Sequence, residues 1–275
     1  MNRFIVPVDF SETSKNAARF AAHLSTLVPD SEIVLYNVFT SIEAGSDGTP
    51  LDSDNGERMS VMELALQSVR TELSGITSSQ ISCVAEESDN LVESLDNYVK
   101  HQGVQLIIMG ITGANRVEQV LMGSNTLKMV ERQTVPVIIV PPDARSESAK
   151  KVMLISDFKE VDKTIPIEPV KKVLNLFSPS LYVVNVDHEH YVELTEEYKA
   201  ERAKLESMLK NYNPEFFFIR LYDFIDAINQ FVTDKEIDMI ITIPKHHRFL
   251  TNLFKTTHTS RLAYHSHVPI VAIHA

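Results

Sequence analysis

Hydrophobic residues along the chain gather in short uninterrupted runs, separated by longer amphipathic stretches. Four runs in the first half are rich in Val and Ile and show no polar alternation: "FIVPV" (4–8), "IVLYNVF" (33–39), "LIIMG" (106–110) and "VIIV" (137–140). Runs of this length and composition are typical of strands buried on both faces. In 91–99 and 224–232, apolar residues recur with helical spacing, and a longer amphipathic stretch covers 190–211. Strands that alternate with helices predict an α/β fold with a mainly parallel sheet.

The pattern occurs twice. "RFIVPVDFS" (3–11) matches "KVMLISDFK" (151–159), which aligns Asp9 with Asp157 at an offset of 148 (157 − 9). "TVPVIIV" (134–140) matches "HVPIVAI" (267–273) at an offset of 133 (267 − 134). Matched elements in a fixed order indicate two homologous domains.

The fall in offset from 148 to 133 and the local composition indicate where the inserted loop and the boundary between the two domains lie. The first half carries the extra residues in "SIEAGSDGTPLDSDNGE" (41–57), which is rich in Gly, Ser and Asp and is typical of a loop. "PPDARSESAKK" (141–151) is polar, opens with two prolines and is the predicted linker. We therefore predict domains over 1–142 and 150–275, each a doubly wound five-stranded, mainly parallel sheet with helices on both faces.

Composition narrows the class of protein. The net charge of -11 argues against a nucleic-acid backbone or an anionic membrane as the main partner. No apolar run is long enough to span a membrane, and the start "MNRFIVPVDFSE" does not resemble a signal peptide. The single cysteine, Cys83, cannot form an internal disulfide and favours a reducing compartment. The sequence predicts a cytoplasmic protein.

Glycine is scarce, with 8 residues in 275, yet three glycines fall within "GITGANRVEQVLMGS" (110–124). Gly110 ends a predicted strand, and Gly123 precedes a predicted helix with Ser124 as its N-cap. Free N–H groups at a helix start, next to glycines that let a ligand approach the backbone, are typical of an anion site. Ordinary turns explain the same residues. No Walker A string occurs.

The spacing G-x2-G-x9-G-S, carried by Gly110, Gly113, Gly123 and Ser124, resembles the motif of the universal stress protein family. "PVDFS" (7–11) and "VPVIIVP" (135–141) fit the same resemblance, which covers nearly the whole chain as one complete domain and one diverged domain. The resemblance implies an adenine nucleotide alpha hydrolase-like fold and an adenine-nucleotide site that takes ATP, usually with a divalent ion such as Mg²⁺.

The resemblance also assigns roles by position. Asp9 would lie at the base and ribose end, and Val38 would present its backbone to the adenine. Gly110, Gly113, Gly123, Ser124 and Asn125 would hold the ribose and phosphates. From the residues alone, Asp9 is equally an acid at a helix start, and Val38 is equally a core residue. Arg116 and Thr126 are further residues that either reach the ligand or face solvent.

The second half lacks this motif. At offset 133, Gly110 becomes Ile243, Gly113 becomes His246 and Gly123 becomes Thr256, while Thr257 keeps a hydroxyl at the Ser124 position. We therefore predict one nucleotide per chain, bound in the first domain. Histidines crowd the degenerate segment at 246–267, which raises zinc binding as an alternative to ordinary surface or core histidines.

Three functions stay open at this point: a nucleotide-binding stress or signalling module, a slow ATP-hydrolysing enzyme, and an interaction protein that binds no nucleotide. No catalytic acid–base pair is evident, which favours binding over turnover. The resemblance further implies that the two domains pair through their last strands, "VPVIIV" (135–140) with "VPIVAI" (268–273). Homodimerisation is a further alternative.

Overall fold

A computed structural model describes most of the chain: residues 1–40, 55–111, 123–132, 135–142, 144, 148–186, 195–219, 224–243 and 268–274. Within these residues, ten strands form one sheet in the order β3-β2-β1-β4-β5-β10-β9-β6-β7-β8. All neighbouring strands are parallel except β5 and β10. The predicted α/β fold with a mainly parallel sheet is confirmed.

The elements follow the predicted alternation of strand and helix. In the first half they are β1 (Asn2–Pro7), α1 (Glu12–Thr26), β2 (Ser31–Phe39), α2 (Asn55–Leu73), β3 (Gln80–Glu87), α3 (Leu91–Gln102), β4 (Val104–Gly110), α4 (Ser124–Arg132) and β5 (Val137–Val140). In the second half they are β6 (Lys151–Ile155), α5 (Val161–Thr164), α6 (Ile167–Phe177), β7 (Ser180–Val186), α7 (Glu196–Leu209), η1 (Lys210–Tyr212), β8 (Glu215–Ile219), α8 (Phe224–Lys235), β9 (Met239–Thr242) and β10 (Ile270–Ala272).

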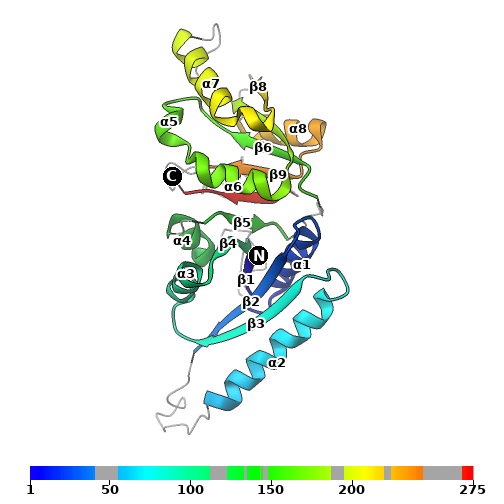
Figure 1. Cartoon of the computed structure of the whole chain (residues 1–275). Coiled ribbons are helices and arrows are strands. Elements are labelled where there is room, and N and C mark those ends of the chain that lie inside the picture. The colour runs from blue at the N-terminus through cyan, green and yellow to red at the C-terminus, as the bar shows by residue number, and fades with distance from the viewer. Residues whose placement is uncertain are drawn as a thin grey trace.

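The strand order repeats from one half to the other. Read from each outer edge inward, β3-β2-β1-β4-β5 and β8-β7-β6-β9-β10 have the same connectivity. The two halves meet at β5 and β10, which pair antiparallel with Val271 opposite Ile138 (Figure 1). The predicted pairing of the two last strands within one chain is confirmed.

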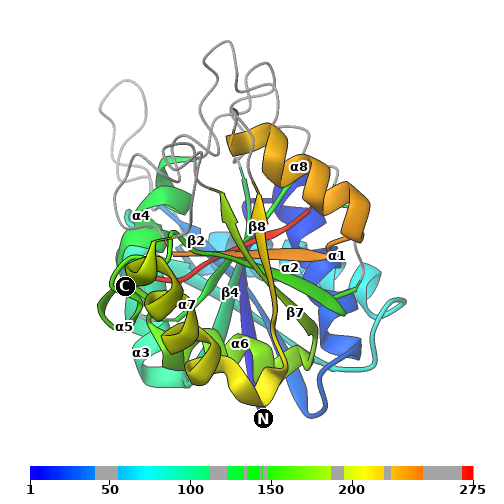
Figure 2. The same ribbon diagram turned by 90° about the horizontal axis from the view of Figure 1, so that it is seen from above.

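Helices cover both faces of the sheet, which twists so that its strands fan across one another in Figure 2. Side chains of α1, α2, α5, α6 and α7 contribute to the buried cluster on one face. Those of α3, α4 and α8 contribute to the cluster on the other face. Because both faces are covered, the central strands carry almost no polar side chains, which explains their uninterrupted apolar runs.

Several boundaries differ from the sequence-based prediction. Helix α2 begins at Asn55, so the predicted loop over 41–57 ends too late, and residues 41–54 lie outside the described part of the chain. The helix predicted over 190–211 is described from Glu196, where the Thr195 hydroxyl accepts a hydrogen bond from the Tyr198 N–H. Of the predicted linker, Pro141 and Pro142 are held to α1 by the Asn16 amide, at 3.0 and 3.3 Å from their carbonyl oxygens.

Helix α1 and its counterpart in the second half differ. Helix α1 is continuous over 15 residues, whereas the second half has α5 and α6 with Ile165 and Pro166 between them. Proline lacks an N–H and disfavours the α conformation in the residue before it, so the break falls at this point. Within the described ranges, no helix has the length and apolar character that crossing a membrane requires.

Candidate functional site

The sheet has a topological switch point next to β1. Strands β2 and β3 lie on one side of β1, and β4 and β5 lie on the other. In doubly wound proteins, ligands bind outside the carboxyl ends of the strands at this point. We call the carboxyl ends of β1, β2 and β4, at Pro7, Phe39 and Gly110, the switch-point edge.

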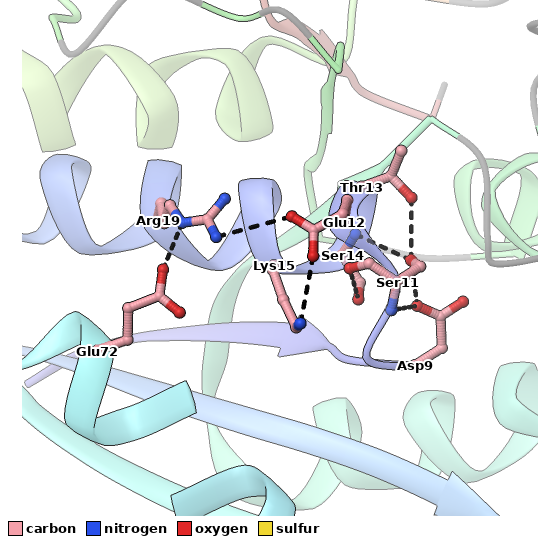
Figure 3. Close-up of polar contacts among 8 residues, drawn as sticks. All are labelled: Asp9, Ser11, Glu12, Thr13, Ser14, Lys15, Arg19 and Glu72. Atoms are coloured by element: carbon pink, nitrogen blue, oxygen red, sulfur yellow. Dashed lines mark hydrogen bonds and ion pairs between the residues drawn. The ribbon is translucent and has the colours of Figure 1, made fainter. Parts of the chain in front are cut away.

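The chain leaves β1 through a tight polar turn (Figure 3). The Asp9 carboxylate accepts a hydrogen bond from the Ser11 N–H, at 3.0 Å from the nitrogen, and another from the Ser11 hydroxyl. Phe10 between them has a φ of 63°, in the left-handed region. Ser11 is the N-cap of α1 and accepts from the Ser14 N–H. Asp9 therefore shapes the turn and is not the helix cap; its side chain is exposed at the switch-point edge.

The flanking strand β2 runs past the end of β1. The last pair of the two strands is Pro7 with Tyr36, and Val8 N–H then donates to Tyr36 C=O at 2.8 Å. Val8 C=O is the next acceptor along this ladder. It accepts a hydrogen bond from the buried side-chain amide of Asn37, whose Nδ2 lies 2.7 Å from the carbonyl oxygen. Backbone groups in a strand point alternately to its two neighbours, so those of Val38 point to the side of β1. Val38 thus presents backbone at the switch-point edge, while its half-buried side chain packs on the core.

Strand β4 ends at Gly110 in a crowded position. A Cβ on Gly110 would lie 2.8 Å from the Thr13 carbonyl oxygen in the first turn of α1. The Gly110 carbonyl accepts a hydrogen bond from the Thr126 hydroxyl, which lies 3.2 Å away. The next residue, Ile111, accepts from the Gly123 N–H at 2.8 Å. The starts of α1 and α4 therefore both contact the end of β4.

Helix α4 begins one residue earlier than predicted. Gly123 C=O accepts the first helical hydrogen bond, from the Leu127 N–H at 3.1 Å, so Gly123 is the N-cap and Ser124 is the first helical residue. The prediction of Ser124 as the cap is wrong, because the cap is the residue whose carbonyl starts the ladder. Ser124 and Asn125 are exposed at this end of the helix. The N–H groups of the first turn have no acceptor within a helix and point outward, which favours an anion.

Two groups of predicted residues lie outside the described part of the chain. Gly113 and Arg116 lie in 112–122, outside the described residues, and so do the histidines of 246–267. In the part of the chain that the structure describes, no group of three or more His, Cys, Asp and Glu side chains could hold a metal ion.

The second half repeats the turn but not the strand end. Asp157 accepts from the Lys159 N–H at 3.2 Å, and Phe158 has a φ of 49°. The Asn185 amide donates to Ser156 C=O at 2.8 Å, as Asn37 does to Val8. At the position of Gly110, however, Ile243 places a half-buried side chain against the core.

Aromatic and acidic side chains pack around the turn after β6 and the start of α5. The Phe158 ring lies 5.1 Å from that of Tyr198, which lies 5.5 Å from that of Phe218. Glu201 of α7 is 9% exposed and accepts from the Val161 N–H at the start of α5, at 2.7 Å. The Glu201 carboxylate is thus an anion that the protein itself supplies at the N-terminus of α5.

Burial also fixes the protonation of a phenol beside the site. The Tyr36 side chain is fully buried on the opposite face of β2 from Asn37, and its hydroxyl donates to the Glu86 carboxylate. Burial, followed by the nearby Glu86, raises the pKa of Tyr36 well above its ordinary value. Tyr36 is therefore a neutral donor that ties β2 to β3.

Sequence reasoning missed the role of Asn37 and left Thr126 undecided between ligand and solvent. Thr126 is 4% exposed and turned inward, toward β4. Asn37 had a usable signal, because Asn37-Val38 recurs as Asn185-Val186 in the repeat. Thr126 had none, since its direction depends on the residue at which α4 begins.

Fold and switch-point edge together define a doubly wound α/β protein in which a helix N-terminus and the backbone of strand ends lie at the carboxyl ends of parallel strands. The sequence profile of the Universal stress protein family matches residues 1–141, and the chain belongs to this family.

Individual relatives agree with this membership. A universal stress protein of Methanocaldococcus jannaschii is 24% identical over an alignment of 156 residues that covers 50% of this chain and 93% of the relative. A universal stress protein of Archaeoglobus fulgidus has a TM-score of 0.69 at 18% identity, covering 99% of this chain and 96% of that chain. A putative universal stress protein of Pseudomonas aeruginosa has a TM-score of 0.59 at 13% identity, covering 100% and 93%. At these identities the two structures show that the fold is shared across the whole chain.

Proposed function

We propose that the chain is a tandem universal stress protein with domains over 1–142 and 150–275, and that the first domain binds ATP with Mg²⁺ as part of a stress or signalling function. The observation that carries the proposal is the contact of the α4 N-terminus with the end of β4, on the same sheet edge as the end of β2 and the turn after β1. A helix N-terminus suits phosphates, and strand-end backbone groups suit the edge of a base.

The proposed ligand contacts follow from this arrangement. Asp9 and the backbone of Val38 take the ribose and base. The residues proposed to hold the ribose and the phosphates are Gly110, Gly113, Gly123, Ser124 and Asn125. In the second domain, Ile243 at the position of Gly110 disfavours the same mode of binding, so one nucleotide per chain is proposed.

Equilibrium dialysis of the purified chain with ATP and Mg²⁺ tests the proposal. We expect about one ATP per chain, and Gly123→Val to weaken binding by roughly tenfold or more, since a β-branched side chain is a poor N-cap and crowds the N–H groups of the first turn. Thr256→Val, at the matching position of the second half, is the control and should leave both stoichiometry and affinity unchanged. Absence of retained nucleotide at millimolar ATP would refute the proposal. Rapid release of ADP would instead indicate an enzyme.

A further inference from the structure

The contact between α4 and β4 involves a side chain that the proposed nucleotide contacts do not include. Thr126 lies in the first turn of α4, and its hydroxyl donates to the Gly110 carbonyl at the carboxyl end of β4. With 4% of its surface exposed, Thr126 is buried, whereas its neighbours Ser124 and Asn125 are exposed. In this helix turn, the exposed side chains can meet a ligand and the buried one holds the helix in place.

The direction of the Gly110 carbonyl shows which part of the sheet edge the Thr126 hydroxyl contacts. The N–H of Ile107 donates to Pro136 C=O and that of Ile111 to Val140 C=O, so these residues direct their backbone to the β5 side. By alternation, the backbone of Gly110 points to the β1 side, beyond the end of β1. The Thr126 hydroxyl therefore ties α4 to the switch-point edge itself.

A second hydrogen bond completes the attachment. The Gly123 N–H donates to Ile111 C=O at 2.8 Å, one residue further along the chain. This backbone bond fixes the cap, but the segment could still pivot about it. The Thr126 bond, three residues along, adds a second point of contact and so sets the direction in which the N–H groups of the α4 first turn point.

From these contacts we infer that Thr126 is a positioning residue, which aims the α4 N-terminus at the phosphates without touching the nucleotide. The inference rests on the proposed ATP site. Loss of the hydroxyl lets the first turn of α4 swing, and N–H groups that are aimed at the phosphates lose alignment. The contacts of Asp9 and Val38 to the base and ribose keep their geometry, because the Thr126 hydroxyl donates to the end of β4 and not to β1 or β2.

The test compares ATP with adenosine, which lacks phosphates, by titration calorimetry with Mg²⁺. We expect Thr126→Val, which keeps the shape and removes the donor, to weaken ATP binding about tenfold, the factor of one ordinary hydrogen bond. Adenosine affinity should change less than about twofold, well under the factor of one hydrogen bond. Thr126→Ser, which restores a hydroxyl, should recover most of the ATP affinity.

Thr71→Val is the matched control, because the Thr71 hydroxyl also donates to a backbone carbonyl, that of Gln67, but lies on α2. It should leave the ATP-to-adenosine ratio unchanged. Should Thr126→Val fail to fold, Thr126→Cys, a weak donor of similar size, should show the same split between the two ligands. Equal weakening of both ligands, or no weakening of either, would overturn the inference but not the proposal of an ATP site. A wild-type chain that binds neither ligand would overturn the proposed function and the inference with it.

Discussion

We expect Val271→Asp to lower the free energy of unfolding by more than about 4 kcal/mol, because it buries a carboxylate with no partner at the centre of the sheet. Val271 is fully buried. It pairs with Ile138 on one side and with Ile241 on the other, at the junction of the two halves.

Urea unfolding followed by circular dichroism measures this effect. Val61→Asp is the matched control, because Val61 is 56% exposed on α2 and the same substitution there costs no burial of charge. It should stay within about 0.5 kcal/mol of the wild type, as surface substitutions do. A Val271→Asp protein as stable as the Val61→Asp protein would show that β5 and β10 do not form a packed junction in solution.

The strands at this junction show what a sequence can predict. "VIIV" and "IVA" are short and purely apolar, and the repeat aligns them, so both their existence and their equivalence follow from the pattern. The family resemblance implied that they pair with each other, and the structure adds that the pairing is antiparallel. Nothing in either segment alone specifies the partner strand, because any exposed apolar edge could pair with any other.

The helix starts show where sequence reasoning falls short. Ser11 was overlooked as a cap beside the more conspicuous Asp9, and Ser124 was preferred over Gly123. Serine and glycine are both favoured at N-caps, so the choice between adjacent residues depends on how the helix packs on β4. A shift of one residue in the start of α4 rotates every side chain by about 100°, which is why Thr126 turns inward.

The difference between the halves was predicted in part. The replacement of Gly110 by Ile243 was visible in the alignment, and it was interpreted as loss of a ligand contact. The structure adds a packing reason, since the strand end at Gly110 touches the backbone of α1 and leaves no room for a side chain. In the second half, where Ile243 has a side chain at this place, the helix following β6 is a short α5 and a separate α6. The glycine, the continuous α1 and the approach of α1 to β4 therefore go together.

This packing leads to a second prediction, for Gly110→Ala. Its Cβ would lie 2.8 Å from the Thr13 carbonyl oxygen and 2.9 Å from the carbonyl carbon, which are backbone atoms that cannot rotate away. We expect α1 to shift and the free energy of unfolding to fall by about 2 kcal/mol, the cost of overpacking in a dense core. Thermal or urea unfolding of the ligand-free protein measures the change.

Gly75→Ala is the matched control, because a Cβ on Gly75 would have an ordinary contact of 3.5 Å with the Glu72 carbonyl oxygen. It should leave stability within about 0.5 kcal/mol of the wild type. If Gly110→Ala is as stable as Gly75→Ala but binds ATP more weakly, this glycine serves the ligand alone. If it is destabilised without ligand, as we expect, the first glycine of the motif is required by the contact between α1 and β4, and the ligand-specific part of the motif narrows to Gly113 and the start of α4.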